Sequence, residues 1–359
     1  MILLTRLPDN LIIMKLSVHL VAWNGAKYIP HLFESLRQQT CRDWLLYIVD
    51  NDSKDNTVEL IKKELENFPV PYKLVVNTNN NGFAGGHNQA YCDTDNEYFL
   101  LLNQDMYLQK DCLQNMVDFL DKNTSVAAVS PRLMKWNFGQ IASVGLEKSL
   151  SNQVDALGLK VFRNRRVVEQ YTQYDWNELK NKFSQNELEV FGVSGAFPMM
   201  RRSIIDKVAF SGQQFLDETY HAYKEDVDLS YRLQEAGYKS FILLGTIAHH
   251  DRTGAGPKTM DDNSALENKK KQSPWVQYHS YKNHLRTLYK NEYWQNFILD
   301  FPWILWYELK KLIYFCLFDR KVLSGLKEVW QERKDLIGKR TQINKIKKVS
   351  YKDLRKWWN

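Results

Sequence analysis

Two groups of acidic residues have the types and the spacing that chemistry at a polar site requires. Asp105 ends the triplet 103–105, NQD, directly after the apolar run 98–102. Asp226 lies in the acidic segment 225–228, EDVD, which apolar residues follow at helical spacing. A carboxylate at the end of a buried strand can hold a divalent cation through oxygen. A carboxylate in the first turn of a helix is favoured by the helix dipole and can take a proton from a hydroxyl.

Each acidic group also has an ordinary structural explanation. Asn and Asp at a strand end commonly form a local turn, and acids in a first helical turn can simply cap the helix. A second triplet, Asp93-Thr94-Asp95, matches an acid-x-acid pattern more literally, but it precedes the apolar run and so lies at the other end of the predicted strand. We therefore take Asp105 as the candidate metal ligand and Asp226 as the candidate general base.

Alternating strands and helices must position these residues. The predicted strands cover residues 16–23, 44–49, 72–76 and 98–107. The predicted helices cover residues 29–40, 57–67, a segment from 88 onward, and 111–122. This alternation predicts a doubly wound α/β fold, with a mostly parallel sheet and helices on both faces. Ligands bind beyond the carboxyl ends of the strands in such sheets, so the polar strand ends should meet in one crevice.

Polar residues and glycines follow each predicted strand. Asn24 follows the first strand, Asp50 and Asn51 follow the second, and the glycine-rich segment 79–90 follows the third. Asp50 and Asn51 can accept hydrogen bonds from a base, and the glycines allow close approach of the backbone to a ligand. The alternatives are a turn or helix cap and a flexible loop. The glycines do not fit the G-x-G-x-x-G dinucleotide pattern.

Five segments together resemble family 2 glycosyltransferases with the GT-A fold. They are VAWNG at 21–25, VDNDSKDNT at 49–57, NNNGFAGGHNQA at 79–90, LLNQD at 101–105 and EDVDLSYR at 225–232. Their order and spacing carry the resemblance, which covers about residues 15–254 and looks closest to bacterial rhamnosyltransferase-like enzymes of surface polysaccharide assembly. It implies inverting, metal-dependent transfer of a sugar from a nucleoside diphosphate to an acceptor hydroxyl.

The resemblance also implies roles for individual residues. Asp226 would be the base that takes the proton from the acceptor hydroxyl. Asp105 would bind Mn²⁺ or Mg²⁺, with His249 or His250, at the end of the predicted strand 240–248, as a further contact. The expected substrate-binding residues are Ala22, Asn24, Asp50, Asn51, Asn81, Gly82, Gly85, Asn88, Asn103, Gln104, Gly195, Glu225 and Arg252, the last in a segment 252–254 expected to close over the diphosphate.

The sequence says less about the identity of the sugar donor and of the acceptor. The resemblance suggests dTDP-rhamnose, whereas a UDP-sugar would use the same base contacts, and the expected acceptor is a saccharide or a lipid-linked saccharide. Two other classes remain open. A nucleotidyltransferase would need a basic glycine-rich loop near the first strand, and VAWNGAKY at 21–28 is a poor match. The other is a non-catalytic protein that binds nucleotide sugars at a membrane surface.

Charge divides the chain of 359 residues. Residues 256–359 contain 22 Lys and Arg against 11 Asp and Glu, a net charge of +11, so the remaining residues carry −4 of the total of +7. We expect a loose N-terminal extension at 1–13, a catalytic domain at 14–255 and a helical, basic, amphipathic region at 256–359. The four cysteines are scattered, which favours reduced thiols and a cytoplasmic location over zinc or disulfides.

The basic region is predicted to form helices over 278–290, 303–318 and 322–337. Its apolar positions and tryptophans, interleaved with lysines, suit a peripheral contact with an anionic membrane. A helical cap packed on the catalytic domain is the alternative. Nucleic acid is not an expected partner, because no recognised module accompanies the charge. Acidic and basic residues interrupt 297–318, so no membrane-spanning helix is expected there.

Overall fold

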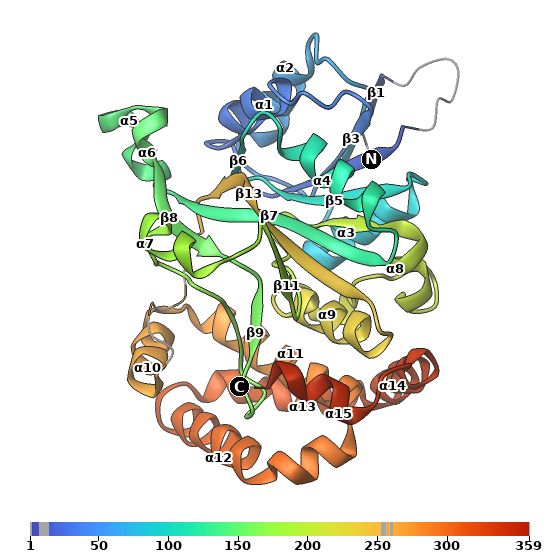
Figure 1. Ribbon diagram of the computed structural model, residues 1–359, viewed down its shortest axis with the longest axis vertical. Coiled ribbons are helices and arrows are strands. Elements are labelled where there is room, and N and C mark those ends of the chain that lie inside the picture. The colour runs from blue at the N-terminus through green and yellow to red at the C-terminus, as the bar shows by residue number, and fades with distance from the viewer. Residues whose placement is uncertain (1, 7–13, 253–255, 257, 259–260, 359) are drawn as a thin grey trace.

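A computed structural model describes residues 2–6, 14–252, 256, 258 and 261–358. Their centre is an 11-stranded mixed sheet with helices on both faces (Figure 1). Nine strands follow in the order β1 (Ile2–Arg6), β4 (Tyr72–Val76), β3 (Trp44–Asp50), β2 (Leu16–Ala22), β5 (Tyr98–Asn103), β12 (Met199–Arg201), β7 (Val126–Trp136), β13 (Lys239–His250) and β11 (Glu187–Val190). The other two lie off this path: β6 (Met106–Leu108) pairs with β13, and β8 (Leu150–Ala156) pairs with β7. The predicted fold class is confirmed.

The first half of the sheet has the predicted parallel arrangement. β2 pairs in parallel with β3 and β5, and β3 pairs in parallel with β4. Its connecting helices are α1 (Ile29–Arg37), α2 (Thr57–Leu65), α3 (Gly82–Cys92) and α4 (Cys112–Lys122). The apolar runs are buried because α1, α2 and α4 cover one face and α3, α8 (Arg202–Val208) and α9 (Glu225–Glu235) cover the other.

The second half is mixed. β12 is antiparallel to both β5 and β7, whereas β13 is parallel to β7. The predicted strand 98–107 divides in two, because the chain turns at Gln104 and Asp105 before β6 (Met106–Leu108), which pairs with the end of β13. The remaining elements of this half are α5 (Ile141–Val144), α6 (Leu146–Ser149), β8 (Leu150–Ala156), β9 (Leu159–Val161), β10 (Val167–Glu169) and α7 (Trp176–Leu179).

Two local expectations need correction. The N-terminal segment was expected to be loose, but Ile2–Arg6 forms β1, an edge strand antiparallel to β4; residues 7–13 lie outside the described residues. The helix expected from residue 88 onward begins at Gly82, so much of the predicted glycine-rich loop is the first turns of α3. Single-sequence patterns place element ends poorly, and an edge strand needs a partner that the local sequence does not show.

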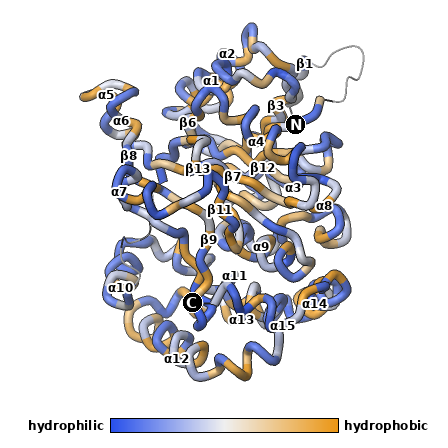
Figure 2. Tube along the Cα trace, viewed as in Figure 1, coloured by the Kyte–Doolittle hydropathy of each residue, from blue (hydrophilic) through white to orange (hydrophobic). Residues whose placement is uncertain are grey.

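The C-terminal region is helical, as expected. It contains α10 (Asp262–Lys271), α11 (Pro274–Asn291), α12 (Trp294–Phe318), α13 (Ser324–Gln331), α14 (Arg333–Ile346) and α15 (Tyr351–Leu354). The predicted helix 322–337 is broken between α13 and α14. Figure 1 shows these helices gathered on one side of the sheet, and Figure 2 shows hydrophobic residues along α12. Within the described ranges, no helix is both long and apolar enough to cross a membrane.

Candidate active site

The turn after β5 brings Asp105 to the end of β13. The pairing of β6 with β13 places Asp105 Oδ1 3.4 Å from His250 Nε2. The other ring nitrogen of His250, Nδ1, lies 2.9 Å from Asp155 Oδ2. Burial by itself would lower the pKa of His250, but the charges of Asp105 and Asp155 outweigh it and raise that pKa to about 9. A protonated His250 therefore joins the two carboxylates.

His249 lies on the other side of β13, because successive side chains of a strand point to opposite faces. Its ring is buried, and among the described residues its Nδ1 has no hydrogen-bond partner. Burial and the nearby charge of Arg132 lower the pKa of His249 to about 4. Of the two predicted histidines, the structure brings His250 to Asp105 and places His249 beside Arg132.

Arg252 extends the polar network from Asp155. Its Nε lies 3.1 Å from Asp155, and its Nη2 donates to Glu169 and to Ser194 Oγ at 3.1 and 3.2 Å. Burial alone would raise the pKa of Asp155, but Arg252 and His250 hold it below its usual value. Arg252 thus braces the site from within, and the rest of its expected loop, Thr253 and Gly254, lies outside the described residues.

Asp226 occupies the first turn of α9, where the helix dipole favours a carboxylate. Its Oδ2 accepts a hydrogen bond of 3.1 Å from the backbone N–H of Gly195. A Cβ on Gly195 would lie 3.4 Å from the Cβ of Asp226, an ordinary van der Waals contact, so the two backbones pass close together. Gly195 follows Ser194, so one continuous network runs from Asp105 through His250, Asp155, Arg252 and Ser194 to Asp226.

Glu225 differs from its neighbour in being buried. Its Oε2 has no hydrogen-bond partner among the described residues. Burial, together with the charge of Asp226, raises the pKa of Glu225 to about 8. Glu225 is therefore uncharged at neutral pH.

The predicted base-binding residues lie at the end of β3. The carboxylate of Asp50 is buried and accepts from the Ser53 N–H at 3.0 Å and from Ser53 Oγ at 2.5 Å. Burial raises the pKa of Asp50 despite these bonds. Asn24 approaches from the end of β2, where its backbone N–H donates to Ser53 Oγ at 2.9 Å. The end of β2 and the end of β3 are thus joined through Ser53.

Several predicted substrate contacts are instead engaged with the chain. Asn51 donates from Nδ2 to Gly82 O at 2.9 Å, and its own backbone N–H donates to Ala22 O at 2.8 Å. Asn88 is buried, donates to Leu216 O at 2.8 Å and accepts from the Leu216 N–H at 3.1 Å. These amides fasten α3 to its neighbours.

The glycines and Asn81 at the start of α3 also lie in close quarters. Gly82 has a φ of +74°, and a Cβ there would lie 2.5 Å from His221. A Cβ on Gly85 would lie 2.9 Å from the Cβ of Asn81, whose side chain accepts a hydrogen bond from Asn79. Packing within the chain thus accounts for the glycine at 82, independently of any ligand.

Gln104 joins the ends of two strands. Its Oε1 accepts from the Trp23 N–H at 2.9 Å, and its Nε2 donates to Trp23 O at 3.0 Å. This leaves Gly25 without room for a side chain, because a Cβ there would lie 2.1 Å from Gln104 Oε1. Asn103 pairs with Val21 across the sheet. The residues before Asp105 therefore shape the turn that presents its carboxylate.

Sequence reasoning missed Asp155 and Glu169. They lie on β8 and β10, 95 and 83 residues from the partners that they contact on and after β13. Neither stands in a motif or at a recognisable strand end. Only the folded chain shows that Asp155 bridges His250 and Arg252.

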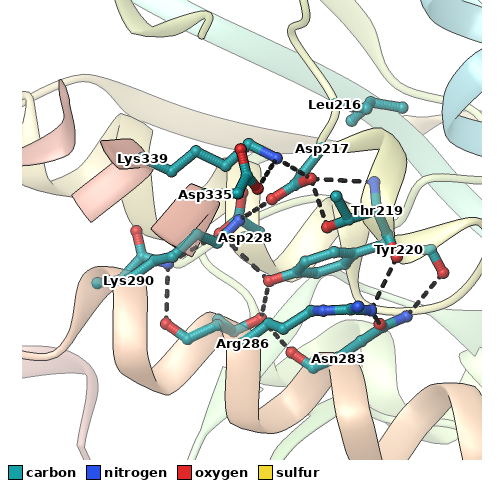
Figure 3. Close-up of polar contacts among 12 residues, drawn as sticks. Leu216, Asp217, Thr219, Tyr220, Asp228, Asn283, Arg286, Lys290, Asp335 and Lys339 are labelled. Atoms are coloured by element: carbon teal, nitrogen blue, oxygen red, sulfur yellow. Dashed lines mark hydrogen bonds and ion pairs between the residues drawn. The ribbon is translucent and has the colours of Figure 1, made fainter. Parts of the chain in front are cut away.

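A second network of buried charges supports α9 from below (Figure 3). Asp217 meets Lys290 Nζ at 2.5 Å and Lys339 Nζ at 2.7 Å, so α11 and α14 both bind the segment before α9. Lys290 also lies 2.9 Å from Asp228, two residues beyond Asp226. Asp228 is further held by Arg232 at 3.2 Å. The C-terminal region therefore packs on the helix that carries the candidate base.

The residues around Asp105 fit a divalent cation that takes most of its ligands from elsewhere. Within the described ranges, no group of three or more His, Cys, Asp and Glu side chains could hold a metal ion alone. Asp105 nevertheless offers a partly exposed carboxylate, and Mg²⁺ commonly needs only one or two carboxylates besides phosphate oxygens and water. The donor set therefore fits a cation bound together with a diphosphate.

Comparisons with known proteins agree with this geometry. The sequence model of Glycosyl transferase family 2 matches residues 17–209, more than half of the chain. The O-antigen chain rhamnosyltransferase RfbN of Salmonella typhimurium is 23% identical over 66% of this chain and 66% of its own length. The uncharacterized glycosyltransferase YfnE of Bacillus subtilis is 21% identical over 69% and 68%.

Other matches cover less of the known protein. The poly(ribitol-phosphate) β-N-acetylglucosaminyltransferase TarS of Staphylococcus aureus is 28% identical over 31% of this chain, which spans only 20% of that relative. Among solved structures, GalNAc-T7 with UDP, GalNAc and Mn²⁺ aligns with a TM-score of 0.54 at 12% identity, over 78% of this chain and 48% of that one. This last likeness concerns the fold alone.

Proposed function

The chain belongs to glycosyl transferase family 2, and we propose that it transfers a sugar from a nucleoside diphosphate to an acceptor hydroxyl with inversion at the anomeric carbon. The observation that carries the proposal is the continuous polar network that joins Asp105 to Asp226. It links a carboxylate suited to a diphosphate-bound cation with a carboxylate suited to a base, which are the two functions that this transfer needs.

Asp226 acts as the general base in this proposal. It takes the proton from the acceptor hydroxyl while that oxygen forms a bond to the anomeric carbon. The bond from the anomeric carbon to the diphosphate breaks on the opposite side, so a single displacement inverts the configuration. The Gly195 N–H fixes one carboxylate oxygen of Asp226 in place for this step. The neutral Glu225 beside it can donate a hydrogen bond to the acceptor.

Asp105 would hold Mn²⁺ or Mg²⁺ together with the donor, and His250 would hold that carboxylate in place. When bound, the cation neutralises charge that develops on the departing diphosphate. Asp50 and Asn24 lie at the neighbouring strand ends, where a uracil or thymine base would reach them. The donor that we propose is linked to dTDP or UDP. RfbN, an O-antigen chain rhamnosyltransferase, and TarS, a poly(ribitol-phosphate) β-N-acetylglucosaminyltransferase, support an acceptor in cell-surface polysaccharide synthesis.

The surface of α12 supports a peripheral contact with a membrane. Its polar residues face the protein: Asp300 meets Arg165 at 3.1 Å and Arg355 at 2.9 Å, and Glu308 meets His284 at 2.8 Å. Its large apolar residues are exposed instead; they include Trp294, Ile298, Trp306, Ile313, Leu317 and Phe318. An apolar helix surface in a region of net charge +11 suits an anionic bilayer. A lipid-linked acceptor would be met there.

An Asp226→Asn variant tests the proposal. We expect sugar transfer to fall by about 10²–10⁴-fold, because the base is lost, while binding of UDP or dTDP with Mn²⁺, measured by thermal shift, stays unchanged. Asp95→Asn, an exposed acid of the other triplet, is the matched control and should keep full activity. Transfer by Asp226→Asn at the wild-type rate, or a product with retained anomeric configuration by NMR, would refute the mechanism.

A further inference from the structure

A cavity of about 400 Å³ lies away from the network just described. It is bounded by β7, by β13 and by the segment from α7 towards β11, at the end of the sheet opposite β1 (Figure 1). Arg132 of β7 and Trp176 of α7 form part of its wall. Lys180, Asn181 and Asn186 are exposed residues of the same lining. The lining is therefore polar and basic.

Arg132 is the unusual residue of this cavity. Its side chain belongs to a residue that is 7% exposed, and Nε is buried without a hydrogen-bond partner. In the part of the chain that the structure describes, no carboxylate forms an ion pair with it. The guanidinium instead lies 3.8 Å from the centre of the Trp176 ring, and Trp176 stacks on Phe183. Aromatic rings hold the guanidinium, and its charge is not balanced.

Three other buried arginines of this chain pair with carboxylates, and the buried Arg202 donates to two backbone carbonyls and a hydroxyl. Arg165 lies 2.5 Å from Glu292, Arg232 lies 3.2 Å from Asp228, and Arg286 lies 3.0 Å from Glu328. A buried charge without a partner is costly, because the loss of hydration is not compensated. Burial lowers the pKa of Arg132 only to about 10, so the group is still a cation at neutral pH. An anion bound beside the guanidinium would supply the partner that the described residues do not.

We infer that this cavity binds an oxyanion, the phosphate or carboxylate group of a saccharide. Arg132 supplies a planar, fixed donor edge that matches such a group. Lys180 adds a second positive charge, and the side-chain amides of Asn181 and Asn186 add hydrogen-bond donors.

The position of the cavity connects it to the acceptor. Ile247 is the register partner of Arg132, and His250 that of Lys135, so Arg132 lies three residues, roughly 10 Å, from the end of β13. The side chain of Arg132 shares its face of β7 with Met134, which packs in the same core as Leu229 of α9. We extend the inference to the acceptor: the anionic group of a saccharide whose hydroxyl lies at Asp226 would occupy this cavity. This extension rests on the proposed function, whereas the anion site does not.

Thermal unfolding with inorganic phosphate, against chloride at equal ionic strength and with EDTA present, tests the site. We expect low millimolar phosphate to stabilise the wild type, since a ligand of the folded state raises its stability. In Arg132→Met this binding should weaken by about ten- to a hundredfold. Without phosphate, Arg132→Met should be at least as stable as the wild type, because an unbalanced cation is gone.

Two further variants control the measurement. Arg42→Gln removes an exposed arginine from another part of the surface and should respond to phosphate as the wild type does. Lys180→Gln, at an exposed position that the fold does not depend on, should independently lower the affinity for phosphate. An equal phosphate response in wild type, Arg132→Met and Lys180→Gln would overturn the site. A loss of stability in Arg132→Met without phosphate would make Arg132 a packing residue and would also overturn it.

Glucose 6-phosphate, with glucose as the neutral control, separates a saccharide site from a site for free phosphate. Stabilisation by glucose 6-phosphate that Arg132→Met loses supports the saccharide; stabilisation by inorganic phosphate alone overturns that part. For the acceptor, we expect Arg132→Met to raise KM for a phosphorylated acceptor with kcat retained. Unchanged KM would refute the acceptor role while leaving the Asp226 mechanism intact.

Discussion

At the level of single residues, some side chains of the site are hydrogen-bonded to the protein itself, and others are available to a ligand. The side-chain amides of Asn51, Asn88 and Gln104 form hydrogen bonds with backbone atoms of neighbouring segments. Asp105 is different, because its carboxylate is partly exposed and meets the side chain of His250 at 3.4 Å. Of these amides, Gln104 fixes the turn that carries the Asp105 carboxylate, although the sequence alone would assign it to substrate.

Asp105→Asn should remove the cation. We expect wild type to bind Mn²⁺ appreciably only with UDP or dTDP present, since one carboxylate makes a weak site alone. Loss of a ligand should cost at least the ten- to hundredfold that loss of a supporting residue typically costs. Isothermal titration of Mn²⁺ with and without UDP measures this, with Asp95→Asn as control. Tight Mn²⁺ binding by the variant would contradict the assignment.

His87 predicts acid sensitivity. It is fully buried in α3, and neither ring nitrogen has a hydrogen-bond partner among the described residues. Burial lowers the pKa of His87 to about 3. The unfolded chain binds a proton near pH 6.5, so the contribution of His87 to stability is present above that pH and is lost as the pH falls towards 3.

The loss from His87 should reach about 2 kcal/mol by pH 5. His87→Leu keeps a similar volume and does not titrate. Urea unfolding at pH 8 and pH 5 should therefore show a smaller drop in the free energy of unfolding for His87→Leu than for wild type. Equal drops in the free energy of unfolding would mean that His87 is not kept neutral by burial in the folded state.

At the level of elements, α9 is positioned by helices far along the chain. Asn283 of α11 donates to three backbone carbonyls just before α9, at Tyr220, Ala222 and Tyr223. Lys224, at the start of α9, has a φ of 72°, which is unusual for a residue with a side chain. The C-terminal helices thus hold the turn that aims Asp226, so the basic region contributes to the catalytic unit.

Asp217→Asn tests how much the buried ion pairs of Asp217 with Lys290 and Lys339 stabilise the packing of α11 and α14 near α9. The variant leaves Lys290 and Lys339 buried without their shared carboxylate (Figure 3). Breaking a buried ion pair on one side costs about 3–5 kcal/mol. Urea unfolding measures the change. The control, Asp335→Asn, removes a half-exposed partner of Lys339 and should cost less than about 1 kcal/mol. Similar losses of stability in the two variants would argue against a stabilising role for the buried ion pairs of Asp217.

At the level of the whole molecule, the C-terminal region has two sides. One packs on the catalytic domain through buried ion pairs, and the other presents the apolar residues of α12. The sequence left open whether this region is a cap or a membrane surface. The packing establishes the cap, and the exposed residues are the basis for the proposed membrane contact.

A double variant tests the membrane contact. Trp306 and Ile313 are 62% and 56% exposed and lie seven residues apart on α12. We expect the wild type to float with vesicles that contain anionic lipid, less so at high salt. Trp306→Glu with Ile313→Glu should weaken this by more than about a hundredfold, since two apolar side chains no longer insert.

The control for the vesicle experiment is Val144→Glu, an exposed apolar residue of α5 in the other half of the molecule. It should float as wild type does. Flotation of the double variant at the wild-type level, or no flotation of wild type at all, would rule out α12 as a membrane surface.

The sequence by itself determined the order of strands and helices, the positions of Asp105 and Asp226, and the basic helical end of the chain. These follow from periodicity, composition and residues at element ends, which are local properties. The sheet's strand ends, from β2 to β5, lie where the apolar runs end.

The tertiary structure decided what depends on distant partners. The pleat of β13 turns His250, and not His249, to Asp105. Asp155 reaches His250 across 95 residues of sequence, and β1 becomes a strand only because β4 offers an edge. On α12, Asp300 is buried because it meets three arginines from other segments, and many large apolar residues of the helix are exposed. Each is a long-range contact, and no local pattern encodes it.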